Sequence, residues 1–168
     1  MLSIDSIYSG VSMNTQLTRQ DIQILSLLQD DASISVEAIA EKLAMSKSAC
    51  WRRIKKYEEL GIIRGRFAVL EPNKVNLSLT VYISVRTQEH SDDWSSKFLA
   101  LMETLPEIIE VHRMSGDLDY LIKAVLSDMS RYDDLYVKLC KTHPMDISAA
   151  FVMKTLRSTT RLPLQPTA

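Results

Sequence analysis

Positively charged side chains are concentrated in one short part of the sequence, residues 46–66. This segment carries seven basic residues against two acidic ones, Glu58 and Glu59. The basic residues are Lys47, Arg52, Arg53, Lys55, Lys56, Arg64 and Arg66. Lysine and arginine at this density neutralise phosphates, and arginine also donates hydrogen bonds to base edges. The segment is therefore predicted to bind a polyanion; the alternative is an ordinary solvated helix face without a partner.

Helical spacing divides the segment Ser46–Gly61 into two faces. At about 3.6 residues per turn, one stripe is predicted to pack against the core. That stripe consists of Cys50, Ile54 and Tyr57. The opposite side points away from the stripe, so its residues are the candidates for contacts with base edges in a groove. These candidates are Ser48, Trp51, Arg52 and Lys55.

Further residues near this helix are predicted to bind phosphates. Arg53 and Lys56 flank the reading face, and Arg64 follows the helix. The complete predicted DNA-binding set is Ser46, Lys47, Ser48, Trp51, Arg52, Arg53, Lys55, Lys56 and Arg64. Two members have structural alternatives: Trp51 as a half-buried packing residue and Arg53 as a partner in an internal salt bridge.

Three helix starts indicate how this segment is positioned. Thr18 followed by Asp21 predicts a capped first helix, Ser35 begins a second, and Ser46 caps the basic one. Two short helices joined by a tight turn form a helix-turn-helix, whose second member normally enters the major groove. After a left-handed cap at Gly61, the composition of residues 62–72 predicts a short β segment.

Composition limits the class of protein. With 168 residues, 46% of them hydrophobic, the chain is long enough for one medium or two small domains, and its net charge is −1. Cys50 and Cys140 have no partners at metal-ligand spacing, which favours a reducing cytoplasm and neither a disulfide framework nor a metal site. No apolar run reaches the length of a membrane span. Residues 1–16 are predicted to be a tail and are assigned no function.

Strand and helix patterns alternate in the second half of the chain. A strand pattern at Leu79–Val85 precedes a helical pattern that ends before Pro106, and two apolar runs then meet at a glycine-containing turn. A helix over Met129–Cys140 and a strand around Ala149–Thr155 complete a βαββαβ order. This order predicts an α+β, ferredoxin-like domain with helices on one face of an antiparallel sheet. The uncovered face predicts a homodimer.

The order of these motifs resembles the Lrp/AsnC, or feast/famine, family of bacterial transcription regulators. The resemblance rests on LTRQDIQILSLLQDD, VEAIAEKLAMSKSACWRRIKKYEELGIIRG and AVLEP, and it covers the first half almost completely from Leu17. Many members have Ser-Pro followed by a second proline where this chain has Ser46-Lys47 and Ala49, so its base preference is expected to differ. The resemblance continues in the second half through Arg161-Leu162-Pro163-Leu164.

The resemblance implies an effector site at the glycine-containing turn, where dimers of the family meet. The matching residues are Ser115, Gly116, Asp117, Leu118, Asp119 and Tyr120. Free backbone N–H groups of a turn accept an α-carboxylate, and an aspartate accepts an α-ammonium group. The alternative is a plain hairpin turn with Asp119 capping a strand. Cysteine, leucine and methionine are the candidate effectors; the segments HSDDW, RMSGDLDYL and SRYDDLYVKL resemble a branch that senses sulfur amino acids, particularly cysteine.

The expected organisation is a tail (1–16), a winged helix-turn-helix domain (17–71), a hinge (72–77) and a ferredoxin-like domain for effector binding and oligomerisation (78–168). The expected function is transcriptional regulation in a bacterial or archaeal cytoplasm, associated with the nucleoid, by homodimers that assemble into tetramers or octamers. One alternative is an architectural DNA-wrapping protein without an effector. An enzyme is the other, but His112, His143, Asp117 and Asp119 show no catalytic spacing, and no cofactor or metal is expected.

Overall fold

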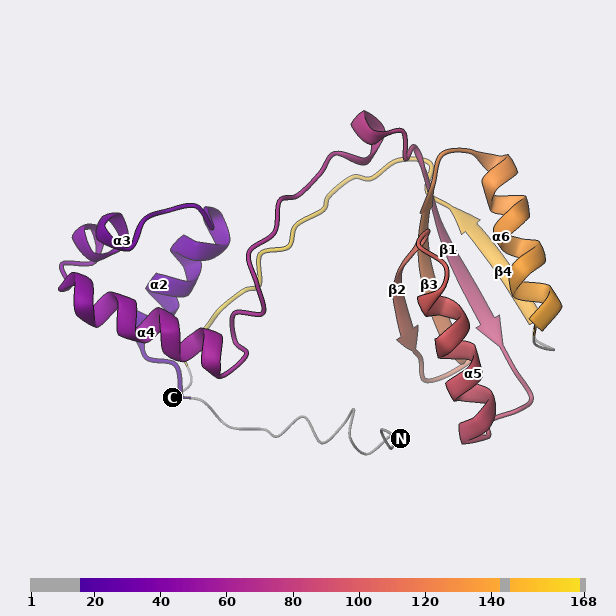
Figure 1. The fold of residues 1–168 in the computed structure, drawn as a ribbon, viewed down its shortest axis with the longest axis horizontal. Coiled ribbons are helices and arrows are strands. Elements are labelled where there is room, and N and C mark those ends of the chain that lie inside the picture. The colour runs from indigo at the N-terminus through magenta and orange to yellow at the C-terminus, as the bar shows by residue number, and fades with distance from the viewer. Residues whose placement is uncertain (1–15, 143–145, 167–168) are drawn as a thin grey trace. The chain divides into compact units, whose positions relative to one another are not determined.

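The computed structural model describes residues 16–142 and 146–166, which group into two compact units (Figure 1). The first unit contains residues 16–68 together with residues 158–166, which we call the return segment. The second unit spans Val69–Arg157. The predicted domain boundaries differ from the limits of these units at both junctions. The prediction placed residues 69–71 in the first domain and all of residues 78–168 in the second.

The first unit is built from three helices, α2 (Arg19–Asp30), α3 (Val36–Lys42) and α4 (Lys47–Glu59). Each begins after a side chain that accepts a backbone N–H, so the unpaired donors of the first turn are satisfied. These caps are Thr18, Ser35 and Ser46, as predicted. At the start of α2 the partnership is reciprocal, because the Asp21 carboxylate also accepts the backbone N–H of Thr18 at 2.8 Å.

The predicted packing stripe of α4 forms the centre of the first unit's core. The buried apolar side chains of this unit come from all three helices: Ile24, Leu25, Ile39, Ala40, Cys50, Ile54 and Tyr57. Cys50, Ile54 and Tyr57 are at most 4% exposed. Burying these three side chains fixes the rotation of α4 about its axis, and the opposite face is consequently presented to solvent.

The chain after α4 departs from the prediction. Gly61 ends the helix with a φ of +68°, a left-handed conformation that suits glycine. No strand forms over residues 62–71, so the predicted β segment is wrong. High β propensity does not produce a strand by itself, and within the described chain this segment forms no ladder. The predicted hinge begins with a single 3₁₀ turn, η1 (Pro72–Val75).

The second unit has the predicted βαββαβ order. Its elements are β1 (Leu79–Arg86), α5 (Asp92–Glu103), β2 (Ile108–Arg113), β3 (Tyr120–Leu126), α6 (Met129–Thr142) and β4 (Asp146–Phe151). The four strands form an antiparallel sheet in the order β2-β3-β1-β4 (Figure 1). This confirms the α+β, ferredoxin-like fold. In the described ranges no helix has the length and apolar character needed to cross a membrane.

Helices α5 and α6 share one face of this sheet. Alternate residues of β1, namely Val81, Ile83 and Val85, are fully buried against side chains that include Phe98 and Leu135. The intervening residues of β1 point to the other face, where Tyr82 lies opposite Lys123 of β3. Tyr82 is 37% exposed. One face of the sheet therefore carries the core, and the helices leave the other face uncovered.

Candidate nucleic-acid interface and effector loop

The outward face of α4 carries the residues predicted to read bases. Ser48, Trp51, Arg52, Lys55 and Lys56 are all exposed. A shallow hollow of about 360 Å³ lies at the beginning of the helix. Its lining consists of Ser46, Ser48, Ala49, Trp51 and Arg52. One capped helix thus displays hydroxyl, indole and guanidinium groups beside each other in a concave surface.

Several basic side chains of this region already have acidic partners. Lys47 pairs with Glu37 of α3. Glu58 pairs with both Lys55, at 2.8 Å between Nζ and Oε2, and Arg66, at 3.2 Å between Nη2 and Oε1. These pairs are largely exposed, so each contributes little to stability and can exchange its carboxylate for a phosphate.

Three exposed basic residues of the region have no ion pair within residues 16–142 and 146–166: Arg52, Lys56 and Arg64. Arg52 and Lys56 are four residues apart on α4, and Arg64 follows soon after the helix ends. Residues i and i+4 of a helix lie on the same face. These three cations are available to an anionic partner without breaking a contact inside the unit.

Arg53 has a different environment. Its guanidinium group binds the Asp21 carboxylate, and its Nη2 donates to Oε1 of Gln20 at 3.1 Å. The structure therefore contains the internal salt bridge that was the alternative to phosphate binding for Arg53. Arg53 joins α4 to α2, and its side chain is only 34% exposed.

Asp21 is the centre of a polar network inside the first unit. It is 7% exposed, and its carboxylate accepts the Thr18 hydroxyl at 2.8 Å, the Tyr57 hydroxyl and the Arg53 guanidinium. Burial raises the pKa of Asp21, but the hydrogen bonds from Tyr57, Thr18 and Arg53 outweigh it and hold this pKa below its usual value. Burial, followed by the Asp21 carboxylate, raises the pKa of Tyr57. Asp21 therefore stays ionised and fixes α4 against α2.

The predicted effector loop joins β2 to β3. Gly116 has a φ of +97°, which favours glycine at this turn. Asp119 accepts the backbone N–H of Thr87 through Oδ2 at 2.8 Å, while its Oδ1 lies 3.8 Å from Nδ1 of His90. Arg86 donates from Nε to the backbone oxygen of Asp117 at 2.7 Å. The loop is thus held by the last residue of β1 and by the residues that follow it.

Sequence reasoning missed Arg86, Thr87 and His90. These residues lie about thirty positions before the loop in the chain, and the register of β1 against β3 brings them to it. Val85 is opposite Tyr120 in that register, which places residues 86–90 beside Asp119. The alternation of β1 predicted a strand, but its pairing register was not deduced.

Tyr120 is a core residue in the structure. It is 6% exposed, and its ring centroid lies 4.7 Å from that of Phe98 and 5.8 Å from that of Trp94. Its hydroxyl lies 3.3 Å from the Ser95 hydroxyl. By contrast, Ser115, Gly116 and Asp117 are exposed, and Leu118 and Asp119 are half-buried. Only the first part of the predicted set is freely accessible.

Of the histidines considered for catalysis, His112 lies in β2 with its Nε2 3.2 Å from Oε2 of Glu110. It is exposed and lies near the end of β2, where its ring nitrogen faces Glu110 rather than an aspartate of the loop. His143 lies outside the described residues. In the described part of the chain, no hydrogen bond or ion pair joins His112 to Asp117 or Asp119.

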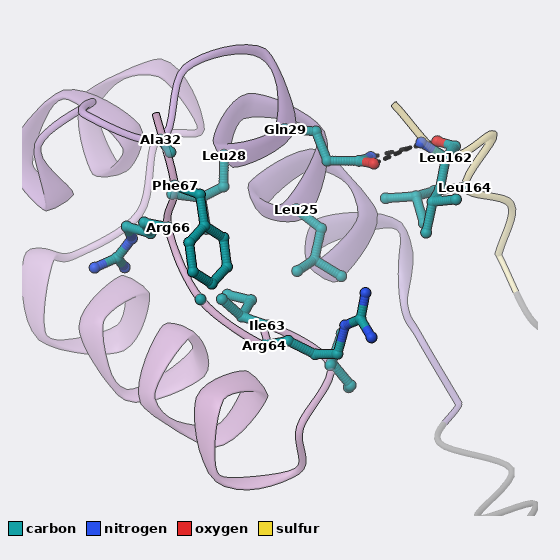
Figure 2. A pocket seen from close by; sticks show the side chains of 12 residues that line it. Leu25, Leu28, Gln29, Ala32, Ile63, Arg64, Arg66, Phe67, Leu162 and Leu164 are labelled. Atoms are coloured by element: carbon teal, nitrogen blue, oxygen red, sulfur yellow. Dashed lines mark hydrogen bonds between the residues drawn. The ribbon is translucent and has the colours of Figure 1, made fainter. Parts of the chain in front are cut away.

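A cavity of about 320 Å³ lies in the first unit rather than at the effector loop (Figure 2). Helix α2, the chain after α4 and the return segment line it with mainly apolar side chains, among them Leu25, Phe67 and Leu164. Figure 2 shows Gln29 reaching the backbone of Leu162, where its amide accepts an N–H at 2.6 Å and donates to the carbonyl oxygen at 3.3 Å.

Comparison with known proteins shows what these two units are. Residues 17–64 match the model for winged helix-turn-helix DNA-binding domains, and residues 80–162 match the model for the Lrp/AsnC ligand binding domain. The glutamate uptake regulatory protein of Zymomonas mobilis is 44% identical over 149 residues, which cover 88% of this chain and 91% of that protein.

Solved structures agree with this match. A crystal structure of an AsnC family transcriptional regulator from Agrobacterium tumefaciens is 43% identical with a TM-score of 0.82, covering 87% of this chain and 96% of that one. A transcriptional regulator from Neisseria meningitidis, in complex with L-methionine, is 33% identical with a TM-score of 0.81, covering 88% and 96%.

A helix-turn-helix unit joined to a ligand-binding βαββαβ unit defines a class of ligand-responsive DNA-binding regulators. The chain belongs to the Lrp/AsnC family of this class. It is a transcriptional regulator and not an enzyme, because the family and the related proteins are regulators. Both the family resemblance and the regulatory function expected from the sequence are confirmed.

Proposed function

We propose that this regulator recognises its operator through the outward face of α4. Arg52, Ser48 and Trp51 contact base edges, and Lys56 and Arg64 contact phosphates. The observation that carries this assignment is a capped and internally braced helix that displays Arg52 and Lys56, with Arg64 soon after its end; none of the three has an ion pair among the described residues. Ser46, Lys47 and Lys55 contribute at the margins, whereas Arg53 acts by positioning α4 through Asp21.

Arg52→Ala is expected to weaken binding to the preferred operator at least about fivefold, since a base-reading arginine contributes about 1–3 kcal/mol of discrimination. Its binding to random duplexes is expected to change much less. Lys56→Ala is expected to weaken binding to all duplexes and to flatten the salt dependence, because one phosphate contact is lost. Fluorescence anisotropy titrations on both duplexes at several salt concentrations measure these effects.

The paired lysine on the same helix provides the matched control. Lys55→Ala removes a charge whose partner is Glu58, so its effect is expected to be smaller than that of Lys56→Ala. Equal affinities of the wild type and Arg52→Ala for operator and random duplexes would contradict the base-reading role of Arg52.

We further propose that the loop between β2 and β3 binds the α-carboxylate and α-ammonium groups of a small amino acid. The similar regulator from Neisseria meningitidis was solved in complex with L-methionine, which supports an amino acid as the class of ligand. Cysteine, leucine and methionine are the candidates. A sulfur amino acid is favoured by the segments HSDDW, RMSGDLDYL and SRYDDLYVKL, which resemble the branch of the family that senses sulfur amino acids. A thermal-shift screen of the twenty amino acids identifies the effector, since a ligand bound only to the folded state raises its melting temperature.

Asp119→Asn is expected to abolish the response to the amino acid while leaving stability nearly unchanged. Asparagine keeps an oxygen that accepts the Thr87 N–H, but it loses the negative charge that attracts an ammonium group. Asp119→Ala is expected to lose the response and also some stability, because the Thr87 N–H loses its acceptor. Isothermal titration with the identified amino acid and thermal unfolding of both variants separate the two effects.

Undiminished amino acid binding by Asp119→Asn would leave Asp119 with the structural role alone. If the wild type itself gives no heat and no change in assembly with any amino acid, the architectural alternative without an effector is favoured instead. The titration and the unfolding measurements use the full chain, so DNA binding by the wild type and by the variants can be compared in the same samples.

We propose a homodimer that assembles further into tetramers or octamers, acting at the nucleoid in the cytoplasm. The uncovered sheet face supports this proposal, because it carries Tyr82 and the Glu110–Lys123 ion pair beside the half-buried Leu121. Apolar side chains on an uncovered face are suited to a second copy of the same face. Light scattering after size-exclusion chromatography measures the mass, and a monomer at micromolar concentration would overturn the proposal.

A further inference from the structure

Trp51 is a large apolar side chain on an otherwise polar helix face. It is 53% exposed and does not belong to the apolar cluster of the first unit. Its neighbours on the same face are Ser48, one turn before it, and Lys55, one turn after it, with Arg52 adjacent. Exposing an indole contributes little to folding, so packing inside the unit does not account for this residue.

The indole also forms part of a concave surface. The hollow at the start of α4 is bounded by the Trp51 side chain, by the hydroxyl-bearing residues Ser46 and Ser48, and by Arg52. The two hydroxyl groups lie 3.3 Å apart, and the Ser46 hydroxyl accepts the N–H of Ala49. Hydroxyl and guanidinium groups suit polar base edges, which leaves the indole to contact an apolar group.

The major groove offers one apolar group on a base edge, the C5 methyl of thymine. We propose that Trp51 recognises a thymine methyl group within the operator. This inference rests on the proposed DNA-reading role of α4, and it adds the class of base that the indole selects. Arg52 then contacts a neighbouring polar base edge, so two adjacent residues read two different chemical features.

Replacing single thymines by uracil tests this proposal, because uracil lacks the methyl group and keeps the base pair. The preferred duplex is first selected with the wild-type full chain from a random duplex pool. Each thymine of that duplex is then replaced in turn, and affinity is measured by anisotropy. The wild type is expected to lose affinity about fourfold at one or more positions, the effect of one buried methyl group.

Trp51→Ala is expected to bind the duplexes with and without that methyl group equally. Trp51→Gln is a second variant, and both are expected to fold because the indole is exposed. Leu60→Ala is the matched control: Leu60 is an apolar residue that caps the far end of α4 and is 40% exposed, and its variant should keep the fourfold preference.

Two results overturn the inference. The first is a wild-type protein for which no thymine-to-uracil replacement changes affinity, as expected if a second protein copy or the sugar-phosphate backbone covers the indole. The second is a penalty of the same size in the Trp51 variants. Failure of the proposed function is distinct, because the wild type would then enrich no duplex from the pool.

Discussion

Replacing Asp21 by alanine is expected to lower the free energy of unfolding of the first unit by about 3 kcal/mol. The substitution removes the acceptor for the Tyr57 hydroxyl, the Arg53 guanidinium and the backbone N–H of Thr18. Two of these donors come from α4, and the Tyr57 side chain is 3% exposed, so water replaces the lost partner poorly. The loss therefore combines a missing helix cap with polar groups left unpaired.

Tryptophan fluorescence during urea unfolding measures this loss unit by unit. The chain has two tryptophans, Trp51 in the first unit and Trp94 in the second. In a Trp94→Phe background the signal reports on the first unit alone. Asp31→Ala is the control, because Asp31 is an exposed aspartate whose side chain accepts only from Ser33 in the described chain. Equal losses for Asp21→Ala and Asp31→Ala would contradict the central role of Asp21.

Acid is expected to reduce the advantage of the wild type over Asp21→Ala. The pKa of Asp21 is lower in the folded state than its usual value of about 3.9 in an unfolded chain. A lowered folded-state pKa contributes stability that is complete above about pH 5 and is lost as pH falls through the unfolded and then the folded value. The difference between the urea midpoints of the two proteins should therefore be smaller at about pH 3 than at pH 7; a constant difference would count against an ionised Asp21.

Local features of this network were visible in the sequence, but its long-range part was not. The Thr18–Asp21 spacing predicted a helix cap, and the structure contains that cap. The same carboxylate also binds Arg53 and Tyr57, which lie 32 and 36 residues later. Spacing along one helix says nothing about such partners. Arg53 was consequently predicted to bind phosphate, whereas its guanidinium holds α2 to α4.

The two units also show which patterns suffice for a prediction. Helices α2 to α4 and the strands of the second unit follow from periodicity, because each buries one face in a local core. Residues 62–71 have a strand-like composition but no ladder partner in the described chain, and they form no strand. Asp119 likewise depends on pairing, since only the β1–β3 register places Thr87 beside it.

The return segment was the least predictable part of the fold. Residues 158–166 have no helical or alternating pattern, and the sequence placed them in the second domain. In the structure, Arg161 pairs with Asp30 at 3.0 Å between Nη1 and Oδ1, and Leu164 packs against the first unit's apolar cluster. The chain thus enters the second unit after residue 68 and rejoins the first unit at residue 158. The contacts of the return segment with α2 join residues that are far apart in the sequence, so no local pattern predicts them.

Leu164→Asp is expected to destabilise the first unit by about 2 kcal/mol, although the residue lies at the opposite end of the chain from α2. A carboxylate replaces an apolar side chain that packs on the α2 side of the core, where it loses hydration without gaining a partner. Hydrogen exchange measured by mass spectrometry on the full chain reports the opening of α2 directly. Faster exchange is expected in peptides from α2, with little change in peptides from β1 and β3.

Two further variants separate docking of the return segment from a general effect of added charge. Gln29→Ala removes both hydrogen bonds to Leu162 and should accelerate exchange in α2 in the same direction, by a smaller factor. Leu156→Asp introduces the same charge at a side chain that is 87% exposed in the second unit, and it should leave α2 unchanged. Unaltered exchange of α2 in both Leu164→Asp and Gln29→Ala would show that the return segment does not stabilise the DNA-binding unit. Faster exchange of α2 in both variants would show that the return segment is a structural part of the helix-turn-helix unit.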